Sequence, residues 1–365
     1  MIFFTSLFCL GYTFWIMFLG LGIFRVGDRR GKKIKSISLI IAARNEENNL
    51  PGLLEHLANL NYPKDKFEII IADDRSSDDT PSILRKAERD YEFIKTVTVK
   101  KEEENFVGKK NALAHAIEKS SGEILAFTDA DCFPKPNWLL EINAHFADDV
   151  DIVSGYSPLL SKNKNFFAGL KNMERSAVFA VNAGSFGWHI GLTTAARNFA
   201  YRRSLYDKVN GFSGISHIRS GDDDLMLQKM SGSSRRMNFM FSRESIVPTS
   251  DKTELKEQIH LETRRASKFK YYPIGIKLML IGILIFYLLY VIVFFQMFFC
   301  PEYLMSWLVW TAMKLFAEFF AVMLFLTKMK EFKQIKYLPF AEFLYIPYFI
   351  FFGLKGTFGN YKWKN

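Results

Sequence analysis

The stretch Ile124-Leu125-Ala126-Phe127-Thr128-Asp129-Ala130-Asp131 places two carboxylates directly after an apolar run of strand length. A short apolar run bounded by polar residues is typical of a buried strand. In open α/β sheets, ligands bind beyond the carboxyl ends of the strands. Carboxylate oxygens at such an end suit Mg²⁺ or Mn²⁺, and the cation would bridge the phosphates of a bound diphosphate. We therefore predict that Asp129 and Asp131 hold a divalent cation and contact a diphosphate.

The segments around this run alternate between strand-like and helix-like patterns. The predicted strands are residues 37–42, 67–73, 94–99, 124–128 and 152–156. The predicted helices are residues 49–60, 81–90, 109–119 and 136–146. Strands that alternate with helices form a mainly parallel sheet covered on both faces, so the fold class is α/β. GxGxxG and GxxxxGK[ST] loops are both missing from the sequence, which argues against a dinucleotide oxidoreductase and a P-loop NTPase.

Apolar stretches precede and follow this α/β region. Residues 2–24 carry no charge and are long enough to cross about 30 Å of hydrocarbon. Basic residues follow them at once, so the positive-inside rule places the next segment in the cytoplasm. Residues 278–299 and 303–327 are two further spans, and residues 337–354 either cross the membrane or lie at its interface. We expect an integral protein of the cytoplasmic (inner) membrane, with one N-terminal and two to three C-terminal transmembrane helices.

The expected domains follow from these spans. Residues 1–24 form an anchor, 25–250 a cytoplasmic catalytic domain, 251–273 an amphipathic helix at the membrane interface, and 274–365 a transmembrane region with a basic tail. Lys314 and Glu318 lie four residues apart inside one span. They form either a paired polar stripe within a helix bundle or a contact to a polar head group or glycan.

Composition restricts the function further. The net charge is +10, but much of the positive charge flanks apolar spans, which favours a membrane surface over nucleic acid as the partner. The three cysteines lack CxxC spacing, so neither a disulfide framework nor a zinc site is indicated.

Three polar groups besides the Asp129 pair are candidates for chemistry. Asp73 ends a strand and could accept hydrogen bonds from a base or a ribose. Lys109 is the first residue of a predicted helix and follows Gly108. A helix N-terminus favours anions, and the Lys109 ammonium would strengthen contact with a phosphate. The alternative is that Lys109 is simply a solvated residue at a helix start. The acids at 222–224 also precede a helix. Their clustering raises the proton affinity of one member, which suits a general base, although helix dipoles also favour acids there.

The ordered set of these motifs resembles the membrane-bound family 2 glycosyltransferases, which are inverting enzymes with a GT-A type nucleotide-binding fold. The resemblance covers roughly residues 37–268. It rests on residues 40–46 (Ile-Ile-Ala-Ala-Arg-Asn-Glu), 72–80 (Ala-Asp-Asp-Arg-Ser-Ser-Asp-Asp-Thr), 108–113, 129–131, 196–202 and 221–225 (Gly-Asp-Asp-Asp-Leu).

The resemblance implies a role for each matching residue. It places the donor beside Ala42, Arg44, Glu46, Asp73, Lys109 and Asp129, and the metal on Asp131 with Asp129. The catalytic acids fall on Asp222 and Asp223. We favour Asp223 as the base, and the register against Asp222 and Asp224 stays open.

One motif departs from the processive members of that family. Their Gln-x-x-Arg-Trp motif aligns with residues 261–265, where the glutamine and the tryptophan are missing. Arg264 and Arg265 remain as partners for a diphosphate. The resemblance therefore implies transfer of one or a few sugars rather than polymerisation.

These observations predict an inverting glycosyltransferase that uses Mg²⁺ or Mn²⁺ and a nucleotide-sugar donor, specifically a UDP-sugar. The expected acceptor is a hydroxyl of a lipid or lipid-linked glycan at the membrane. Two alternatives stay open: a polyprenyl-phosphate glycosyltransferase, whose acceptor oxygen is already anionic, and a non-catalytic transferase-like component of a glycan export complex.

Overall fold

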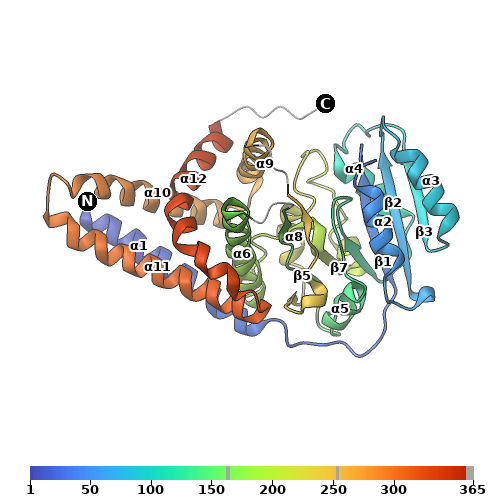
Figure 1. Cartoon of the computed structure of the whole chain (residues 1–365), viewed down its shortest axis with the longest axis horizontal. Helices are drawn as coiled ribbons and strands as arrows, with labels where there is room; N and C mark the ends of the chain where they lie inside the picture. The colour runs from blue at the N-terminus through green and yellow to red at the C-terminus, as the bar shows by residue number, and fades with distance from the viewer. Residues whose placement is uncertain (162–164, 252–254, 359–365) are drawn as a thin grey trace. The chain divides into compact units, whose positions relative to one another are not determined.

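A computed structural model describes the chain except for residues 162–164, 252–254 and 359–365. The chain forms two compact units (Figure 1). The sheet unit comprises Arg25–Lys162 and Ser185–Asp251, and the helical unit comprises Met1–Phe24, Asn163–Gly184 and Lys252–Asn365.

A seven-stranded sheet with the order β3-β2-β1-β4-β7-β5-β8 forms the centre of the sheet unit. All neighbouring strands are parallel except that β7 runs antiparallel to β4 and β5. The sheet is therefore mixed and mainly parallel, as predicted. The strands are β1 (Ile37–Ala43), β2 (Phe67–Asp74), β3 (Ile94–Val99), β4 (Ile124–Phe127), β5 (Ile152–Gly155), β7 (Phe199–Arg202) and β8 (Met237–Met240).

Helices cover both faces of this sheet. Alternate residues of β1 and β2, such as Leu39 and Ile71, enter one apolar core together with α2 (Leu50–Ala58), α3 (Thr80–Asp90) and α5 (Trp138–His145). The helix α4 (Lys109–Glu118) packs against β1, β2 and β3 without joining that core, so it covers the opposite face. The five strands and four helices predicted from the sequence are all present, with ends that differ by at most two residues.

A small two-stranded sheet lies beside the end of β4. It pairs β6 (Leu159–Leu160) in parallel with β9 (Thr249–Ser250). An isolated bridge joins Cys132 to Thr249. The Ser250 amide donates to the Asp131 carbonyl oxygen at 3.1 Å, so β9 fixes the backbone that follows β4.

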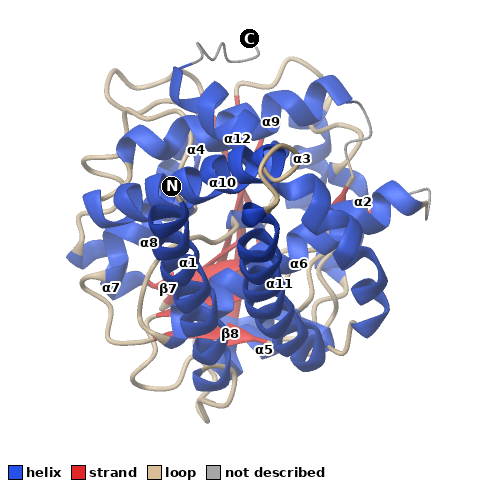
Figure 2. Cartoon of the chain, turned by 90° about the vertical axis from the view of Figure 1, so that its left-hand side faces the viewer, coloured by secondary structure: helices blue, strands red, loops and turns tan. Residues whose placement is uncertain are grey.

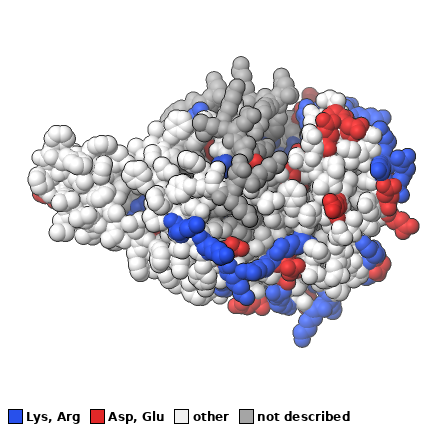
Figure 3. Space-filling model, in the orientation of Figure 1, with Lys and Arg blue, Asp and Glu red and all other residues white. Residues whose placement is uncertain are grey.

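Among the described residues of the helical unit, four helices are long and apolar enough to cross a membrane. They are α1 (Ile2–Gly22), α10 (Ile274–Gln296), α11 (Glu302–Met329) and α12 (Leu338–Phe358). This agrees with one N-terminal and up to three C-terminal spans. Helices α1 and α11 run side by side (Figure 2). The visible surface over α1, α10 and α11 shows few charged side chains (Figure 3), as expected for contact with lipid.

A buried polar network connects these four helices. The Lys314 ammonium lies 2.6 Å from Glu318 of the same helix and 2.5 Å from Glu342 of α12. The Tyr12 hydroxyl of α1 donates to Glu318 and lies 2.9 Å from the Tyr287 hydroxyl of α10. Lys314 is 2% exposed. The structure therefore has the paired arrangement inside the bundle rather than a cation open to head groups.

Two more helices complete the helical unit. The first, α9 (Leu255–Ser267), lies within the segment predicted to be amphipathic, although residues 252–254 of that segment are outside the described residues. The second is α6 (Phe166–Gly187), which the sequence analysis did not predict and most of which belongs to this unit. Gly184 of α6 packs directly against the backbone of Leu19 in α1.

Candidate active site

The carboxyl ends of β2, β1 and β4 lie next to one another in the sheet. These ends and the segments that leave them carry most of the residues selected from the sequence: Ala42 near the end of β1 and residues 44–46 after it, Asp73 and Asp74 at the end of β2, and 128–132 after β4. The site is therefore built where parallel sheets most often bind ligands.

The loops after β1 and β2 are joined by hydrogen bonds. The Asn45 amide donates to Ser76 Oγ at 3.0 Å, and the Ser77 amide donates to Asn45 Oδ1 at 2.8 Å. Asp73 is 5% exposed and accepts from the Ser76 amide at 3.1 Å. One oxygen of Asp73 thus holds the loop in place. Its proposed contact to a base or ribose stays a prediction.

The remaining residues proposed for the nucleoside pocket lie at the end of β1 and just after it. Ala42 is half-buried within the strand, and Arg44 is exposed beyond it. The Glu46 amide donates to Thr80 Oγ1 at 2.8 Å. The Thr80 hydroxyl thus joins this neighbouring loop to the start of α3, and Asp78 accepts from the Thr80 amide at 3.0 Å. The donor roles of Ala42, Arg44 and Glu46 stay predictions.

Lys109 brings two of the acidic motifs together. Its ammonium lies 2.5 Å from Asp129 Oδ1 and 3.2 Å from Asp222 Oδ2. Arg197 adds a second cation, with Nε 4.0 Å from Asp129 Oδ2. Residues from α4, from the end of β4, and from the segment before α8 (Asp224–Ser231) therefore meet at one point.

These contacts shift the ionisation of both partners. Burial opposes the charge on Asp129, but the Lys109 ammonium and the Arg197 guanidinium outweigh it and lower the pKa of Asp129. Burial also opposes the charge on Lys109, and the two carboxylates outweigh that cost and raise its pKa. Asp129 and Lys109 are therefore both charged at neutral pH.

Lys110, the next residue, has a different role. It is 1% exposed, and its ammonium donates to the carbonyl oxygens of Ile218 and, at 2.7 Å, Ser220. Gly108 precedes both lysines with φ +64°, and a Cβ there would lie 3.2 Å from the Arg219 carbonyl oxygen. Glycine is thus required where the start of α4 approaches this segment closely. Lys109 faces the acids, and Lys110 holds the chain that carries them.

The three consecutive acids differ in their surroundings. Asp222 pairs with Lys109. Asp223 is half-buried at the N-terminus of α8, where its side chain accepts from the Asp224 amide at 2.8 Å. Asp224 is 4% exposed and accepts from the Leu225 amide at 2.9 Å. Asp223 lies close enough to Asp129 for its charge to act on the ionisation of that group.

The residues after β4 provide ligands for a hard cation. One ligand atom each from Asp129, Asp131 and Cys132 lies within 4.8 Å of the others. Burial raises the pKa of the Cys132 thiol to about 12, and the thiol donates to Asp131 at 3.7 Å. A neutral thiol is a poor ligand for Mg²⁺ or Mn²⁺, so the two carboxylates are the fitting pair. Thr249 Oγ1 donates to Asp131 Oδ1 at 3.1 Å and orients that carboxylate.

Comparison with known proteins agrees with this geometry. The family model described as Glycosyl transferase family 2 matches residues 38–210. The chain carries a family 2 glycosyltransferase domain.

Curated relatives of this glycosyltransferase domain include two bacterial proteins. One is a probable glycosyltransferase, YdaM, of Bacillus subtilis, 30% identical over 184 residues, which are 50% of this chain and 44% of the relative. Another is a β-monoglucosyldiacylglycerol synthase of Trichormus variabilis, 31% identical over 168 residues, which are 44% of this chain and 36% of the relative. The chain thus spans less than half the length of these two relatives.

A solved structure with the same fold is the mannosyltransferase PcManGT from Pyrobaculum calidifontis, determined with GDP-Man and Mn²⁺. The TM-score is 0.59 at 18% identity, with 97% of this chain and 98% of that chain covered. The glycosyltransferase domain therefore has the GT-A type fold that the resemblance implied.

Two donor residues predicted from the sequence lie outside the sheet unit. Arg264 and Arg265 belong to α9 of the helical unit, and Arg265 pairs with Glu262 at 2.6 Å. Their contact to the donor diphosphate stays a prediction.

Sequence reasoning missed three residues that build the site. Thr249 is far from Asp131 in the chain and follows no recognisable motif. Arg197 lies inside a segment used for the resemblance, but it received no role. Glu102 accepts from the Gly108 amide, but its loop is rich in charged residues, and its sequence does not differ from that of an ordinary solvated turn. The helix-start glycine was the only sequence signal near Glu102.

Proposed function

We propose that this protein is an inverting glycosyltransferase that moves a sugar from a UDP-sugar to a hydroxyl of a membrane-associated acceptor. The observation that carries the proposal is the contact of one ammonium, Lys109, with both Asp129 and Asp222. This contact brings the candidate cation ligands, Asp129 and Asp131, close to the acids at 222–224, which include the candidate base. A single displacement reaction needs the leaving diphosphate and the base on the same substrate.

The donor diphosphate would lie against Lys109 and Arg197 at the carboxyl edge of the sheet. Both side chains are partly exposed, at 30% and 16%, and reach this edge from different elements. Asp129 and Asp131 would hold Mg²⁺ or Mn²⁺, which offsets charge on the departing nucleoside diphosphate. The neighbour PcManGT was determined with Mn²⁺ and a nucleotide sugar, in agreement with this assignment.

Asp223 is the best candidate for the base. Asp222 is held by the Lys109 ammonium, and Asp224 is almost fully buried, whereas Asp223 keeps partial exposure. Asp223 would take the proton of the acceptor hydroxyl as its oxygen attacks the anomeric carbon. The attack comes from the face opposite the diphosphate, so the configuration inverts.

The acceptor is proposed to be a lipid or a lipid-linked glycan. Four helices of the chain could span a membrane, and the relative from Trichormus variabilis is named for a glycosylated diacylglycerol. The basic segment after α1 would place the catalytic domain on the cytoplasmic side of the inner membrane.

A donor screen tests this proposal. Purified full-length protein is incubated with Mn²⁺, diacylglycerol or total lipid extract, and a panel of UDP-, GDP- and dTDP-sugars. Nucleoside diphosphate release and inversion at the anomeric carbon are measured.

We expect release from a UDP-sugar that needs Mn²⁺ and is lost in Asp131→Asn. The matched variant Asp65→Asn, at an exposed position just before β2, should keep its activity. Release that persists unchanged in Asp131→Asn would contradict the metal assignment, and retention of configuration would contradict direct displacement.

A further inference from the structure

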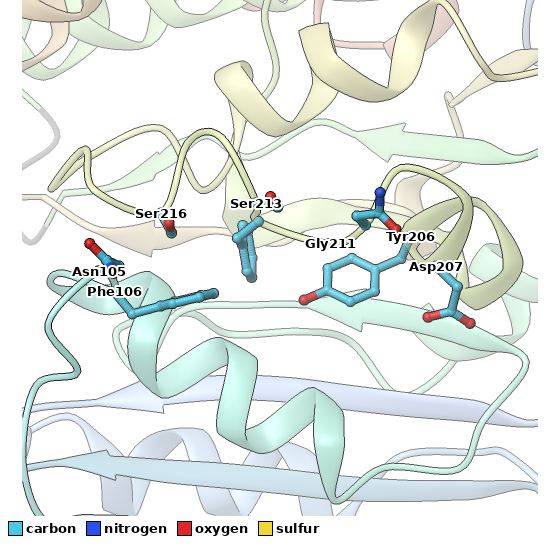
Figure 4. Close-up of a pocket in the computed structure, with 9 residues that line it drawn as sticks. Asn105, Phe106, Tyr206, Asp207, Gly211, Ser213 and Ser216 are labelled. Atoms are coloured by element: carbon cyan, nitrogen blue, oxygen red, sulfur yellow. The ribbon is translucent and has the colours of Figure 1, made fainter.

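A pocket of about 610 Å³ lies in the sheet unit beside the two segments that lead into the candidate active site (Figure 4). One wall comes from Asn105 and Phe106, just before Gly108 and Lys109. The other comes from residues 206–216, just before the acids at 222–224. The volume falls within the range of about 300–1,000 Å³ that is usual for small-molecule sites.

Internal hydrogen bonds hold both walls in place. The Val107 amide donates to the Ser216 carbonyl oxygen at 3.1 Å, which joins one wall to the other. The Lys229 ammonium, from α8, donates to the carbonyl oxygens of Gly211 and Ser213, each at 2.6 Å. The pocket is therefore preformed, and its second wall is tied to the helix that begins at the candidate base.

The lining combines aromatic rings with uncharged polar groups. Phe106 and Tyr206 extend toward each other from opposite sides of the pocket, and Ser213 and Ser216 lie on the loop above them (Figure 4). Asn105 and Asn210 add amides that can both donate and accept. An aromatic ring gives the apolar C–H face of a pyranose a flat surface, and the amides and hydroxyls match its hydroxyl groups.

The charge of the lining excludes other ligands. Of the nine described residues that line the pocket, none is basic, and Asp207 is the only acid. No lining side chain would therefore pair with a phosphate, and the nearby Lys229 ammonium is engaged by the Gly211 and Ser213 carbonyl oxygens. An acyl chain would leave the asparagines and serines facing hydrocarbon, which is unfavourable.

We propose that this pocket binds a neutral saccharide unit other than the sugar being transferred. The unit is either a non-reacting sugar of a glycosylated acceptor or a free saccharide that acts as an effector. In both cases an occupied pocket would brace the segments that lead to Lys109 and to Asp222. Binding of a neutral saccharide here does not depend on the proposed transfer activity, whereas the acceptor as its source rests on that proposed function.

Ligand-observed saturation-transfer NMR tests the binding. Full-length protein is kept in a detergent without sugar head groups, such as an amine oxide, with excess UDP and diamagnetic Mg²⁺ present. The probes are cellobiose, maltose and methyl β-glucoside, with glucose 6-phosphate as the anionic comparison. Ser213→Trp fills the pocket from an exposed position, and Ser204→Trp, exposed on α7 (Arg203–Lys208) and outside the lining, is the matched control.

We expect saturation transfer to at least one neutral saccharide, about tenfold weaker binding in Ser213→Trp, and unchanged binding in Ser204→Trp. No transfer to any of the three neutral probes would overturn the proposal, and so would equal signals in the wild type and Ser213→Trp. Because this readout needs no turnover, its failure is distinct from failure of the donor screen.

Kinetics separate the two sources of the saccharide. If the unit belongs to the acceptor, Ser213→Trp raises the KM for a glycosylated acceptor and leaves the KM for the donor unchanged. If the saccharide is a free effector, adding it changes the kcat of the wild type and of Ser204→Trp but not that of Ser213→Trp. An effect of Ser213→Trp on the donor KM alone would contradict both.

Discussion

The Lys110 ammonium donates to the Ser220 carbonyl oxygen at 2.7 Å from a side chain that is 1% exposed. This contact shows that the adjacent lysines Lys109 and Lys110 have different roles. Lys109 is 30% exposed and pairs with Asp129 and Asp222, whereas Lys110 is part of the framework that positions the acids at 222–224.

Replacing Lys110 with methionine should therefore reduce stability as well as activity. Two buried carbonyl oxygens would lose their charged donor, which costs about 2–3 kcal/mol and lowers the thermal unfolding midpoint by about 5 °C. Lys109→Met is the matched comparison: its main effect should be a higher KM for the donor, with a smaller change in midpoint. An unchanged midpoint in Lys110→Met would show that the loop before the acids does not need this lysine.

Two of the three consecutive acids, Asp223 and Asp224, should respond differently to conversion into asparagine. Asp223→Asn should lower kcat by about 10²–10⁴-fold because the base is lost, with nucleoside diphosphate affinity nearly unchanged. Asp224→Asn should have a small effect, since an amide oxygen can still accept from the Leu225 amide. Steady-state kinetics and calorimetric binding of UDP measure the two effects.

Full activity in Asp223→Asn together with a large loss of kcat in Asp224→Asn would show that Asp223 is not the base. A mild loss in all the variants would instead favour an acceptor oxygen that is already anionic, such as a polyprenyl phosphate.

Thr249 offers a test of the cation pair that leaves both carboxylates in place. Thr249→Val removes the hydroxyl that donates to Asp131. Loss of a group that orients a metal ligand typically weakens metal affinity about 10–100-fold. We expect the Mn²⁺ concentration for half-maximal activity to rise by that factor, with kcat at saturating Mn²⁺ largely restored. Thr96→Val, which removes a hydroxyl bound to Glu88 elsewhere in the domain, is the control and should leave the Mn²⁺ dependence unchanged.

Glu68 makes the stability of the sheet unit depend on pH. Burial opposes its ionisation, but hydrogen bonds from Lys95 and from two serines outweigh it and lower the pKa of Glu68 to about 2. The stabilisation is therefore present above the unfolded value near 4.5 and is lost as pH falls from there toward 2. Glu68→Gln should reduce the free energy of unfolding by about 2–3 kcal/mol at pH 7 and by progressively less below pH 4.

Unfolding midpoints at pH 7 and at pH 3 measure this difference, with the exposed Glu55→Gln as a control. If the midpoints of Glu68→Gln and the wild type differ by as much at pH 3 as at pH 7, ionisation of Glu68 is excluded as the cause of the difference.

Local patterns in the sequence were sufficient for the central fold. The apolar runs of β1, β2 and β4 predicted buried parallel strands, and the polar residues that follow them predicted a ligand edge. The antiparallel strand β7 was not predicted, because Phe199–Arg202 is short and its direction depends on its partners across the sheet. The helix α6 was missed because its apolar residues alternate with polar ones over a long segment without a clear boundary.

Candidate site residues could be selected from the sequence where the residue type itself suggests the chemistry. Residues whose role depends on their place in the fold could not be selected. Asp129 and Lys109 were selected from the sequence, and the structure places their charged groups in contact. Lys110 was indistinguishable from Lys109 by type, and only burial separates the two. Thr249 supports Asp131 across more than a hundred residues, a relationship that no local spacing encodes.

The charges gathered around Lys109 have a consequence for the order in which ligands bind. Four acidic residues gather here, Asp129, Asp131, Asp222 and Asp223, against two basic ones, Lys109 and Arg197. Counted by residue type, the acids exceed the bases by two, the difference that one divalent cation cancels. A bare sugar nucleotide would be repelled, whereas its cation complex would not. Substrate should therefore enter after the cation or together with it, and never ahead of it.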